Sequence, residues 1–267
     1  MNGNSLEIIY HPIGYFHCTQ KEKYAVPRQS VSAHKLVGSI ELLPNLNYEQ
    51  ALADLAGFER IWILFHCHYN QHWKPKVYPP RGGVKRGVFA TRSPHRPNAI
   101  GMSCVKLTGI KGRILTVEEH DLLEGTPILD IKPYVKYADS FPNTRQGWLE
   151  QLPEEKLYEI IWSQKAQQQL EWLQFHLNFN QKTTIELRLS QNPYPYRNNR
   201  IRILPNIKNN DKSVYELAIQ EWRVIYELPP QMTTITIIEI QSGYLDDATE
   251  VPLHHTKYKN YLSFNRE

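Results

Sequence analysis

The first half of the chain is a succession of short β-branched and aromatic segments with turn residues between them. Segments of this kind are typical of strands, and we expect strands at residues 8–15, 60–68, 87–90, 103–107, 114–118 and 128–133. One helix interrupts them, because Asn47 is placed to cap a segment that starts at Tyr48 and Gly57 is placed to end it. Many short strands with one inserted helix predict a compact β-barrel domain.

The pattern changes after Gly147. Apolar residues at helical spacing predict a long amphipathic helix over 153–177. Further on, the pattern of residues 183–189 fits either a helix or a strand. We expect strands at residues 214–226 and 233–240, and a polar loop at residues 205–213. We therefore expect a mainly β protein with some α structure: an N-terminal β-barrel domain over 1–145 and a smaller α+β domain over 146–267.

Composition excludes several classes of protein. A chain of 267 residues with 41% hydrophobic and 11% aromatic residues can bury a core, which excludes disorder along its whole length. Its apolar runs are far shorter than the roughly 20 residues that span a bilayer, so we expect no membrane partner. No secretory signal is evident in the first ten residues. The three scattered cysteines, Cys18, Cys67 and Cys104, fit a reducing cytoplasm, where we expect this protein.

Charge is unevenly distributed along the chain. Residues 1–147 carry 18 Lys and Arg against 12 Asp and Glu, and between Arg60 and Val117 there are 11 basic residues and no acidic one. Such a stretch attracts polyanions by neutralising phosphates, and Lys85 and Arg86 lie in its middle. The alternative is a solvated basic face that is balanced by acidic residues elsewhere in the fold.

Two of four segments with unusual polar residues lie early in the chain. In residues 25–29, AVPRQ, a proline precedes a guanidinium and an amide that could hold a carboxylate or a base edge; the alternative is an ordinary loop. The second segment places His66, Cys67 and His68 at the end of an apolar strand, with His72 further on. Histidine and cysteine side chains are common zinc ligands, so this segment is a candidate metal site. Strand alternation puts Cys67 on the face opposite the two histidines, and no acidic residue is nearby in sequence, so we expect no metal.

The other two segments lie between later strands. Residues 87–103, GVFATRSPHRPNAIGMS, place Arg92 and Arg96 in a loop stiffened by prolines, which presents cations and donors to a ligand. Residues 121–134, DLLEGTPILDIKPY, form a turn whose backbone groups could grip a small ligand. The strand that follows carries Asp130, Lys132 and Tyr134 on one face. A plain turn with a structural Asp–Lys pair is the alternative.

These four segments together resemble a known family, the TsaA-like domain of the TrmO-type tRNA (adenine-N6)-methyltransferases. The matching text is IGYFHCTQKEKYAVPRQ, RIWILFHCH, RGVFATRSPHRPNAIGMSCVKL and DLLEGTPILDIKPYVKYADS, over residues 8–141. In the second half, NPYPYR and VYELAIQEWRVIYEL are similar to the C-terminal region of bacterial members. This chain has Asn192 and Tyr194 where that region usually has an acidic residue and an arginine.

The resemblance implies a β-barrel methyltransferase that uses S-adenosylmethionine and acts as a homodimer. The implied substrate is tRNA, in which N6-threonylcarbamoyladenosine (t6A) at position 37, next to the anticodon, is methylated on N6. The absence of a strand–GxGxxG–helix unit and of a P-loop agrees with a cofactor site that is not of the Rossmann or Walker type. The residues that the resemblance assigns to the cofactor are Pro27, Arg28, Gln29, His66, Cys67, Arg92, Met102, Leu122, Leu123, Glu124 and Gly125.

Substrate contacts are expected from four basic residues, namely Lys85, Arg86, Arg96 and Lys132. The reaction has to remove the N6 proton, and Asp130, Tyr134 or the carboxylate of the substrate could accept it; the sequence leaves this choice open. Two other functions stay open as alternatives. One is a non-catalytic RNA-binding module, supported by the acid-free stretch, and the other is a metal-dependent hydrolase that uses His66, His68 and His72.

Overall fold

The computed structural model describes residues 8–19, 36–79, 82–152, 156–195, 200–205, 213–244 and 251–264. The chain divides into two compact units, Met1–Pro153 and Glu154–Glu267. The sequence placed the domain boundary between residues 145 and 146, whereas the first unit extends through the 3₁₀ helix η4 (Gly147–Gln151). Among the described residues, no helix combines the length and the apolar character that crossing a bilayer requires.

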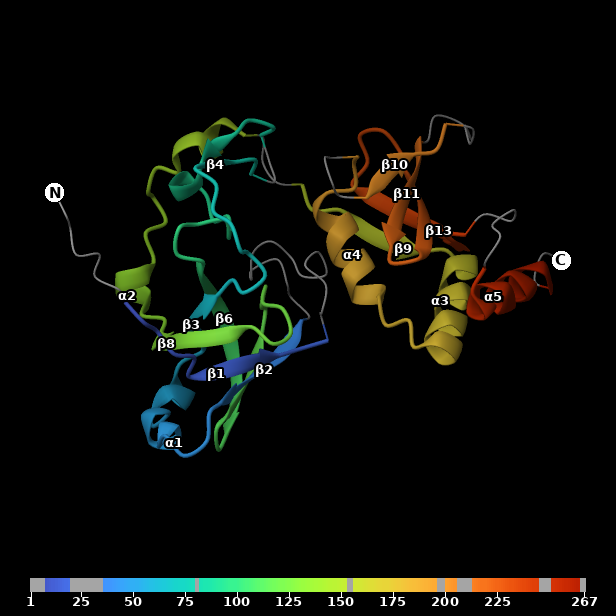
Figure 1. Ribbon diagram of the computed structural model, residues 1–267. Coiled ribbons are helices and arrows are strands. Elements are labelled where there is room, and N and C mark those ends of the chain that lie inside the picture. The colour runs from blue at the N-terminus through green and yellow to red at the C-terminus, as the bar shows by residue number, and fades with distance from the viewer. Residues whose placement is uncertain are drawn as a thin grey trace. The chain divides into compact units, whose positions relative to one another are not determined.

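The first unit is built on a closed barrel of six antiparallel strands (Figure 1). In spatial order these are β1 (Gly14–His17), β2 (Val37–Leu42), β7 (Ile114–Glu118), β6 (Ile100–Lys111), β3 (Arg60–His66) and β8 (Pro127–Pro133). The barrel confirms the expected mainly β fold with an N-terminal β-barrel. The sequence pattern did not predict β2. The strand predicted over 87–90 is wrong, because residues 88–90 form a 3₁₀ helix, η3 (Val88–Ala90). This helix follows a short hairpin of β4 (Lys76–Val77) and β5 (Arg86–Gly87).

Strand alternation fills the barrel. In β3, Ile61 and Ile63 are fully buried, whereas Trp62 and Leu64, which alternate with them, are only partly buried and face outward. The other strands contribute buried residues in the same way, among them Phe16, Ile40, Val105, Leu115, Val117 and Ile128. Burial of this apolar surface is the main stabilising contribution to the barrel.

The helix that interrupts the strands is shorter than expected. It consists of α1 (Tyr48–Ala51) and a separate 3₁₀ turn, η2 (Leu55–Gly57). The expected cap is wrong, because Asn47 has φ 58° and its side chain makes no capping hydrogen bond. A capping residue needs an extended backbone to aim its oxygen at the amides of the first turn. In its left-handed conformation Asn47 instead donates from Nδ2 to Gln50 Oε1, at 2.6 Å. A further short helix, α2 (Lys136–Asp139), follows β8.

The second unit has an α+β fold with a five-stranded sheet. The strand order is β10 (Ile201–Ile203), β11 (Ser213–Ile219), β12 (Trp222–Leu228), β13 (Thr234–Ser242) and β9 (Glu159–Trp162), with β9 parallel to β13. The helices are α3 (Gln164–Leu177), α4 (Lys182–Gln191) and α5 (Leu253–Phe264). In Figure 1, α3 and α5 lie side by side, and the rings of Trp172 and Tyr261 stack 5.1 Å apart between them.

Several expectations for this unit need correction. The helix predicted over 153–177 begins only at Gln164, because residues 159–162 pair with β13 as a strand. The single strand predicted over 214–226 is the hairpin of β11 and β12. The ambiguous segment 183–189 is helical within α4. Most of the predicted polar loop, at 206–212, lies outside the described residues.

Candidate active site

Several of the segments singled out in the sequence meet at one end of the barrel, which we call the rim. The turn 122–125 lies against the end of β1, because the Gly125 amide donates to the Phe16 carbonyl at 2.8 Å. The start of β6 lies against the end of β3, where the Cys67 amide donates to the Ala99 carbonyl at 2.7 Å. The rim is thus formed by the chain around residues 17–18, 36, 66–67, 99–103 and 119–125.

The described residues on either side of the segment 20–35 both contact this rim. The Cys18 amide donates to the Glu124 carboxylate at 2.6 Å, and the Glu119 amide donates to the Leu36 carbonyl at 3.0 Å. The expected cofactor residues Pro27, Arg28 and Gln29 belong to that segment and lie outside the described residues.

The turn 122–125 has a distinct role for each residue. Leu122 is 1% exposed and packs in the barrel core, so a ligand can reach only its backbone. The Leu123 amide donates no hydrogen bond to any described residue, which leaves it available to an acceptor on a ligand. Glu124 accepts from the His17 ring at 3.0 Å as well as from the Cys18 amide, and Gly125 has φ +73°, which favours glycine.

Asp121 is the residue at the rim that the sequence analysis did not select. Its carboxylate accepts a short hydrogen bond from the Ser103 hydroxyl of β6. Burial raises the pKa of Asp121 to about 6, against the opposing effects of the Ser103 hydrogen bond and of the Arg92 charge. An acidic group that is mostly removed from water and close to an arginine is a typical functional-site feature. The only sequence signal was its position directly before the buried Leu122.

The adjacent His120 has a structural role. Its ring is fully buried and lies 4.7 Å from the Phe16 ring. Burial lowers the pKa of His120 to about 4, so the ring is neutral at pH 7.

The predicted cofactor residues His66 and Met102 lie close together on β3 and β6, and Cys67 follows β3 directly. Leu64 pairs with Met102 and His66 pairs with Ile100 in the register of these strands. His66 and Met102 are exposed on the outer face of the barrel. Between them, a Cβ atom on Gly101 would lie 2.4 Å from the Phe65 ring, so only glycine allows this close approach.

The two arginines of the loop 91–99 have different surroundings. Arg96 donates to the carbonyls of Thr91 and Val88, at 2.9 and 3.2 Å, and lies over the Phe89 ring at 5.5 Å. Arg96 therefore braces the loop. Arg92 is exposed, and no hydrogen-bond or ion-pair partner for its guanidinium exists among the described residues. Arg92 is thus the arginine of this loop that is available to an anion.

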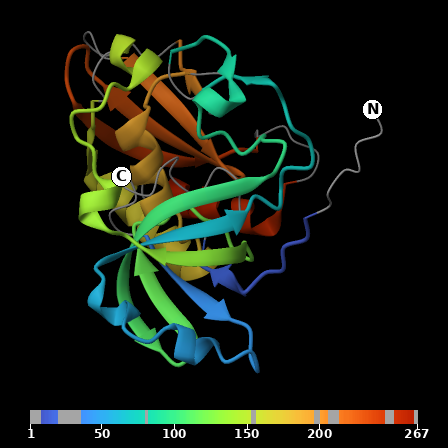
Figure 2. The ribbon, with the colours of Figure 1, turned by 90° about the vertical axis from the view of Figure 1, so that its left-hand side faces the viewer.

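Beside this loop, cations and exposed aromatic rings alternate on one surface. Lys85 lies 5.3 Å from the Tyr78 ring and Arg86 lies 5.2 Å from the Trp148 ring. Two backbone hydrogen bonds join Lys74 to His95 and Val88 to Pro75, and the His95 ring lies 3.4 Å from the His72 carbonyl. Four side chains at least 48% exposed belong to this basic–aromatic surface, namely Tyr69, Trp73, Tyr78 and Phe89. In Figures 1 and 2 the β4–β5 hairpin of this surface, drawn in teal, lies apart from the strands of the barrel.

The residues predicted to handle the proton are less close to the rim. Asp130 pairs with Leu64 in the middle of the sheet, and its carboxylate forms an ion pair with Lys132 at 2.8 Å. Tyr134 follows β8 at the level of Arg60, to whose carbonyl its amide donates at 3.0 Å. Since Arg60 is at the start of β3 and His66 at its end, the structure does not bring Tyr134 to the rim.

The histidines of the second segment do not assemble a metal centre. Among the described residues, His66, His68 and His72 belong to no group of three ligand atoms that lie within 4.8 Å of one another. The geometry therefore gives no support to the alternative of a metal-dependent hydrolase at these positions. None of the three cysteines, Cys18, Cys67 and Cys104, forms a disulfide.

Comparison with known proteins identifies the family. Residues 15–140 match the family model of the tRNA-methyltransferase O N-terminal domain. A putative S-adenosylmethionine-dependent methyltransferase of Pseudomonas aeruginosa is 43% identical over 188 residues, which are 69% of this chain and 80% of that protein. A tRNA (adenine(37)-N6)-methyltransferase of Eikenella corrodens is 32% identical over 70% of this chain and 100% of its own length. The chain belongs to the tRNA-methyltransferase O family.

A solved structure of a family member extends this likeness over both units. The crystal structure of TrmO from Pseudomonas aeruginosa matches with a TM-score of 0.62 and 32% identity, over 89% of this chain and 99% of that chain. The names of the relatives give S-adenosylmethionine as cofactor and describe tRNA (adenine-N6) methyltransferases. At the level of the family, these findings confirm the resemblance, the fold and the cofactor expected from the sequence.

Proposed function

We propose that this protein transfers a methyl group from S-adenosylmethionine to N6 of t6A at position 37 of tRNA. The observation that carries the proposal is the rim, where the partly buried Asp121 carboxylate lies near Arg92 and the Leu123 amide, neither of which has a hydrogen-bond partner among the described residues. Family membership supports the adenine-N6 methyltransferase reaction. The threonylcarbamoyl group of the substrate is the finer part of the proposal and rests on the resemblance and on charge.

The residues at the rim fit the polar ends of this cofactor. S-adenosylmethionine carries a carboxylate, an ammonium group, a cationic sulfonium and an adenine ring. Arg92 is available to the carboxylate, and Asp121 supplies negative charge for the cationic groups. The Leu123 amide, which has no acceptor among the described residues, can donate to the adenine. Glu124 and Gly125 shape the turn, and His66, Cys67 and Met102 lie on or directly after the neighbouring strands.

When bound, the cofactor supplies an electrophilic methyl group. The chain has to hold N6 in line with that group, and such positioning accounts for a large part of the rate of a methyl transfer. It also has to accept the N6 proton, which the carbamoyl substituent makes more acidic. Asp130 is the proposed proton acceptor, because Leu64 pairs with Asp130 on one side and with Met102 on the other, so the three residues lie side by side across the sheet. Tyr134 is proposed to assist Asp130.

The anticodon loop is proposed to bind the basic–aromatic surface. Unpaired bases stack on exposed aromatic rings, and cations neutralise the phosphates between them. Lys85, Arg86 and the exposed rings supply both contacts. Arg92 and Lys132 are the cations proposed to meet the threonyl carboxylate, and Arg96 holds the loop that carries Arg92.

We further propose a homodimer that works in the cytoplasm, where tRNA and the cofactor meet. The dimer follows from the resemblance alone. Light scattering of the purified full chain tests it, and a mass of one chain at micromolar concentration would contradict it.

The test of the reaction compares two tRNA preparations. One comes from wild-type cells and the other from cells that lack the threonylcarbamoyl pathway. Purified enzyme and labelled S-adenosylmethionine are added, and the nucleosides are separated by mass spectrometry. We expect N6-methylated t6A from the first preparation and a rate lower by about tenfold or more with the second, because one charge-assisted contact to the carboxylate is lost.

Two outcomes separate the parts of the proposal. Equal rates with both preparations would show that the carboxylate is not read. Failure to bind S-adenosylmethionine in calorimetry would instead leave a non-catalytic RNA-binding module.

A further inference from the structure

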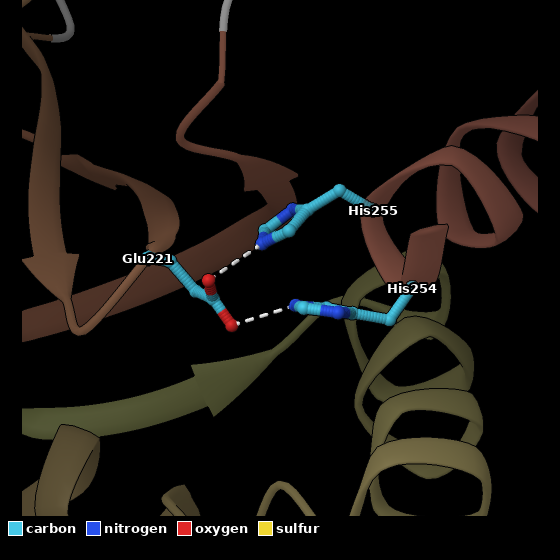
Figure 3. A group of neighbouring side chains, drawn as sticks. All are labelled: Glu221, His254 and His255. Atoms are coloured by element: carbon cyan, nitrogen blue, oxygen red, sulfur yellow. Dashed lines mark hydrogen bonds and ion pairs between the residues drawn. The ribbon is translucent and has the colours of Figure 1, made fainter. Parts of the chain in front are cut away.

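Three metal-ligating side chains converge within the second unit. Glu221 lies in the turn between β11 and β12, and His254 and His255 lie in the first turn of α5 (Figure 3). His254 Nε2 is 2.8 Å from one carboxylate oxygen of Glu221, and His255 Nε2 is 3.1 Å from the other. One ligand atom from each residue lies within 4.8 Å of those of the other two.

The contacts that orient the His255 ring are those of a typical metal-binding histidine. Its ring is fully buried and stacks on Trp222 at 4.2 Å. Its Nδ1 lies 2.8 Å from the Ser242 hydroxyl, which also accepts from the Tyr244 amide at 3.1 Å. Ligating histidines nearly always use the second ring nitrogen in such a contact, which fixes the orientation of the ring. The Ser242 contact thus leaves Nε2 pointing toward Glu221.

The Nε2 atom of His255 makes no hydrogen bond of good geometry with any described residue. It is buried, and the Glu221 carboxylate lies alongside. A buried polar atom of this kind costs free energy unless something satisfies it. A cation between the imidazole and the carboxylate would satisfy the nitrogen lone pair and the carboxylate together.

The donor set indicates which cation fits. Two imidazoles and one carboxylate suit zinc and similar first-row transition metals, whereas calcium and magnesium prefer oxygen ligands only. The side chains of Glu221 and His254 are 35% and 38% exposed, so an ion can enter from solvent. His254 also lines a surface hollow with Trp172, His176 and Lys257, which leaves room for water on the open side of the ion.

We propose that Glu221, His254 and His255 bind one Zn²⁺ ion, with water completing the coordination. The ion ties the β11–β12 turn to the start of α5, and it is independent of the methyl transfer at the rim.

The test uses the full chain without a polyhistidine tag, freed of metal by a chelator. Zn²⁺ is then titrated by calorimetry, and Co²⁺ is added separately to read the coordination geometry from its visible spectrum. We expect one ion per chain and the intense d–d bands of four-coordinate Co²⁺. Glu221→Gln and His254→Ala should each weaken Zn²⁺ binding at least about tenfold, and Ser242→Ala should weaken it by a smaller factor.

The matched control is His72→Ala, which removes an exposed histidine of the first unit and should leave Zn²⁺ affinity unchanged. His255→Ala is avoided as the decisive variant because the ring is part of the core. The proposal is overturned if the full chain binds no stoichiometric Zn²⁺, or if Glu221→Gln and His254→Ala bind it as the unaltered chain does. Loss of binding in His72→Ala alone would also overturn it and would restore the histidines near β3 as the metal site.

Discussion

Arg92 stands out at the residue scale because its guanidinium has no hydrogen-bond or ion-pair partner among the described residues, whereas the neighbouring Arg96 donates to two backbone carbonyls. Arg92→Ala should weaken S-adenosylmethionine binding or tRNA methylation by about 1.5–3 kcal/mol, which corresponds to a loss of ten- to more than a hundredfold. The melting temperature should not change, because the side chain is exposed and its removal leaves no cavity.

Isothermal titration and single-turnover rates measure the effect of Arg92→Ala. Lys111→Ala is the matched control, because Lys111 is an exposed cation at the far end of β6. Unaltered methyl transfer in Arg92→Ala would remove this residue from the site.

Asp121 should make stability and cofactor affinity depend on pH in opposite directions. Its pKa is about 6 in the folded chain, above the ordinary value of 3.8, so the folded chain holds a proton that the unfolded chain releases between these values. Stability therefore falls as pH rises from about 4 to 6, and above pH 6 the ionised carboxylate costs up to about 3 kcal/mol of unfolding free energy. Affinity for a cationic cofactor rises over the same range.

Asp121→Asn tests both effects. At pH 7.5 this variant should melt at a higher temperature than the unaltered chain, and at pH 4 the two should melt together. It should also bind S-adenosylmethionine more weakly at pH 7.5 and without the pH dependence. A variant less stable than the unaltered chain at pH 7.5 would show that Asp121 is a structural acid instead.

At the scale of single elements, the β4–β5 hairpin and the loop after it should govern tRNA affinity. Lys85→Glu should weaken tRNA binding and reduce the slope of log affinity against log salt by about one. Cofactor affinity should stay the same. Lys111→Glu reverses a charge of the same acid-free stretch at the other end of β6 and should have a smaller effect. Filter binding at several salt concentrations measures both, and equal effects of the two variants would indicate a diffuse field without a defined surface.

Helix α3 depends on Ser163, the capping residue directly before it. Ser163 accepts from the Ala166 amide at 3.1 Å and donates to the Ile238 carbonyl of β13 at 2.9 Å, so one hydroxyl caps the helix and fixes it to the sheet. Ser163→Ala should lower the unfolding free energy of the second unit by about 1–2 kcal/mol in urea denaturation. Gln168→Ala, on the exposed face of the same helix, should stay within about 0.5 kcal/mol. A smaller loss in Ser163→Ala than in this control would contradict the assignment.

The same helix shows why some elements could be predicted from the sequence and others could not. Strand β7 alternates cleanly and lies where the pattern placed it, at Ile114–Glu118. Residues 159–162 also match a helical apolar pattern, but pairing with β13, about 75 positions later, makes them a strand. Local pattern cannot reveal such a distant partner. Asp121 was missed for a similar reason, since its Ser103 partner is on another strand.

At the scale of the whole molecule, the two units have separate hydrophobic cores. Every residue of the barrel core lies before residue 132, and every residue of the other core lies after residue 157. The described residues of the rim and of the basic–aromatic surface belong to the first unit. A unit of about 150 residues buries enough surface to fold by itself.

A chain that ends at Leu152 should therefore fold and bind S-adenosylmethionine as the full chain does. Scanning calorimetry of the full chain should show two transitions, because two cores melt separately, and the shortened chain should reproduce one of them. Cofactor should raise the midpoint of that transition in both proteins, since it binds only the folded barrel. A shortened chain that folds but does not bind would show that the second unit completes the cofactor site. A single transition in the full chain, with an unfolded shortened chain, would show that the barrel depends on the second unit for its stability.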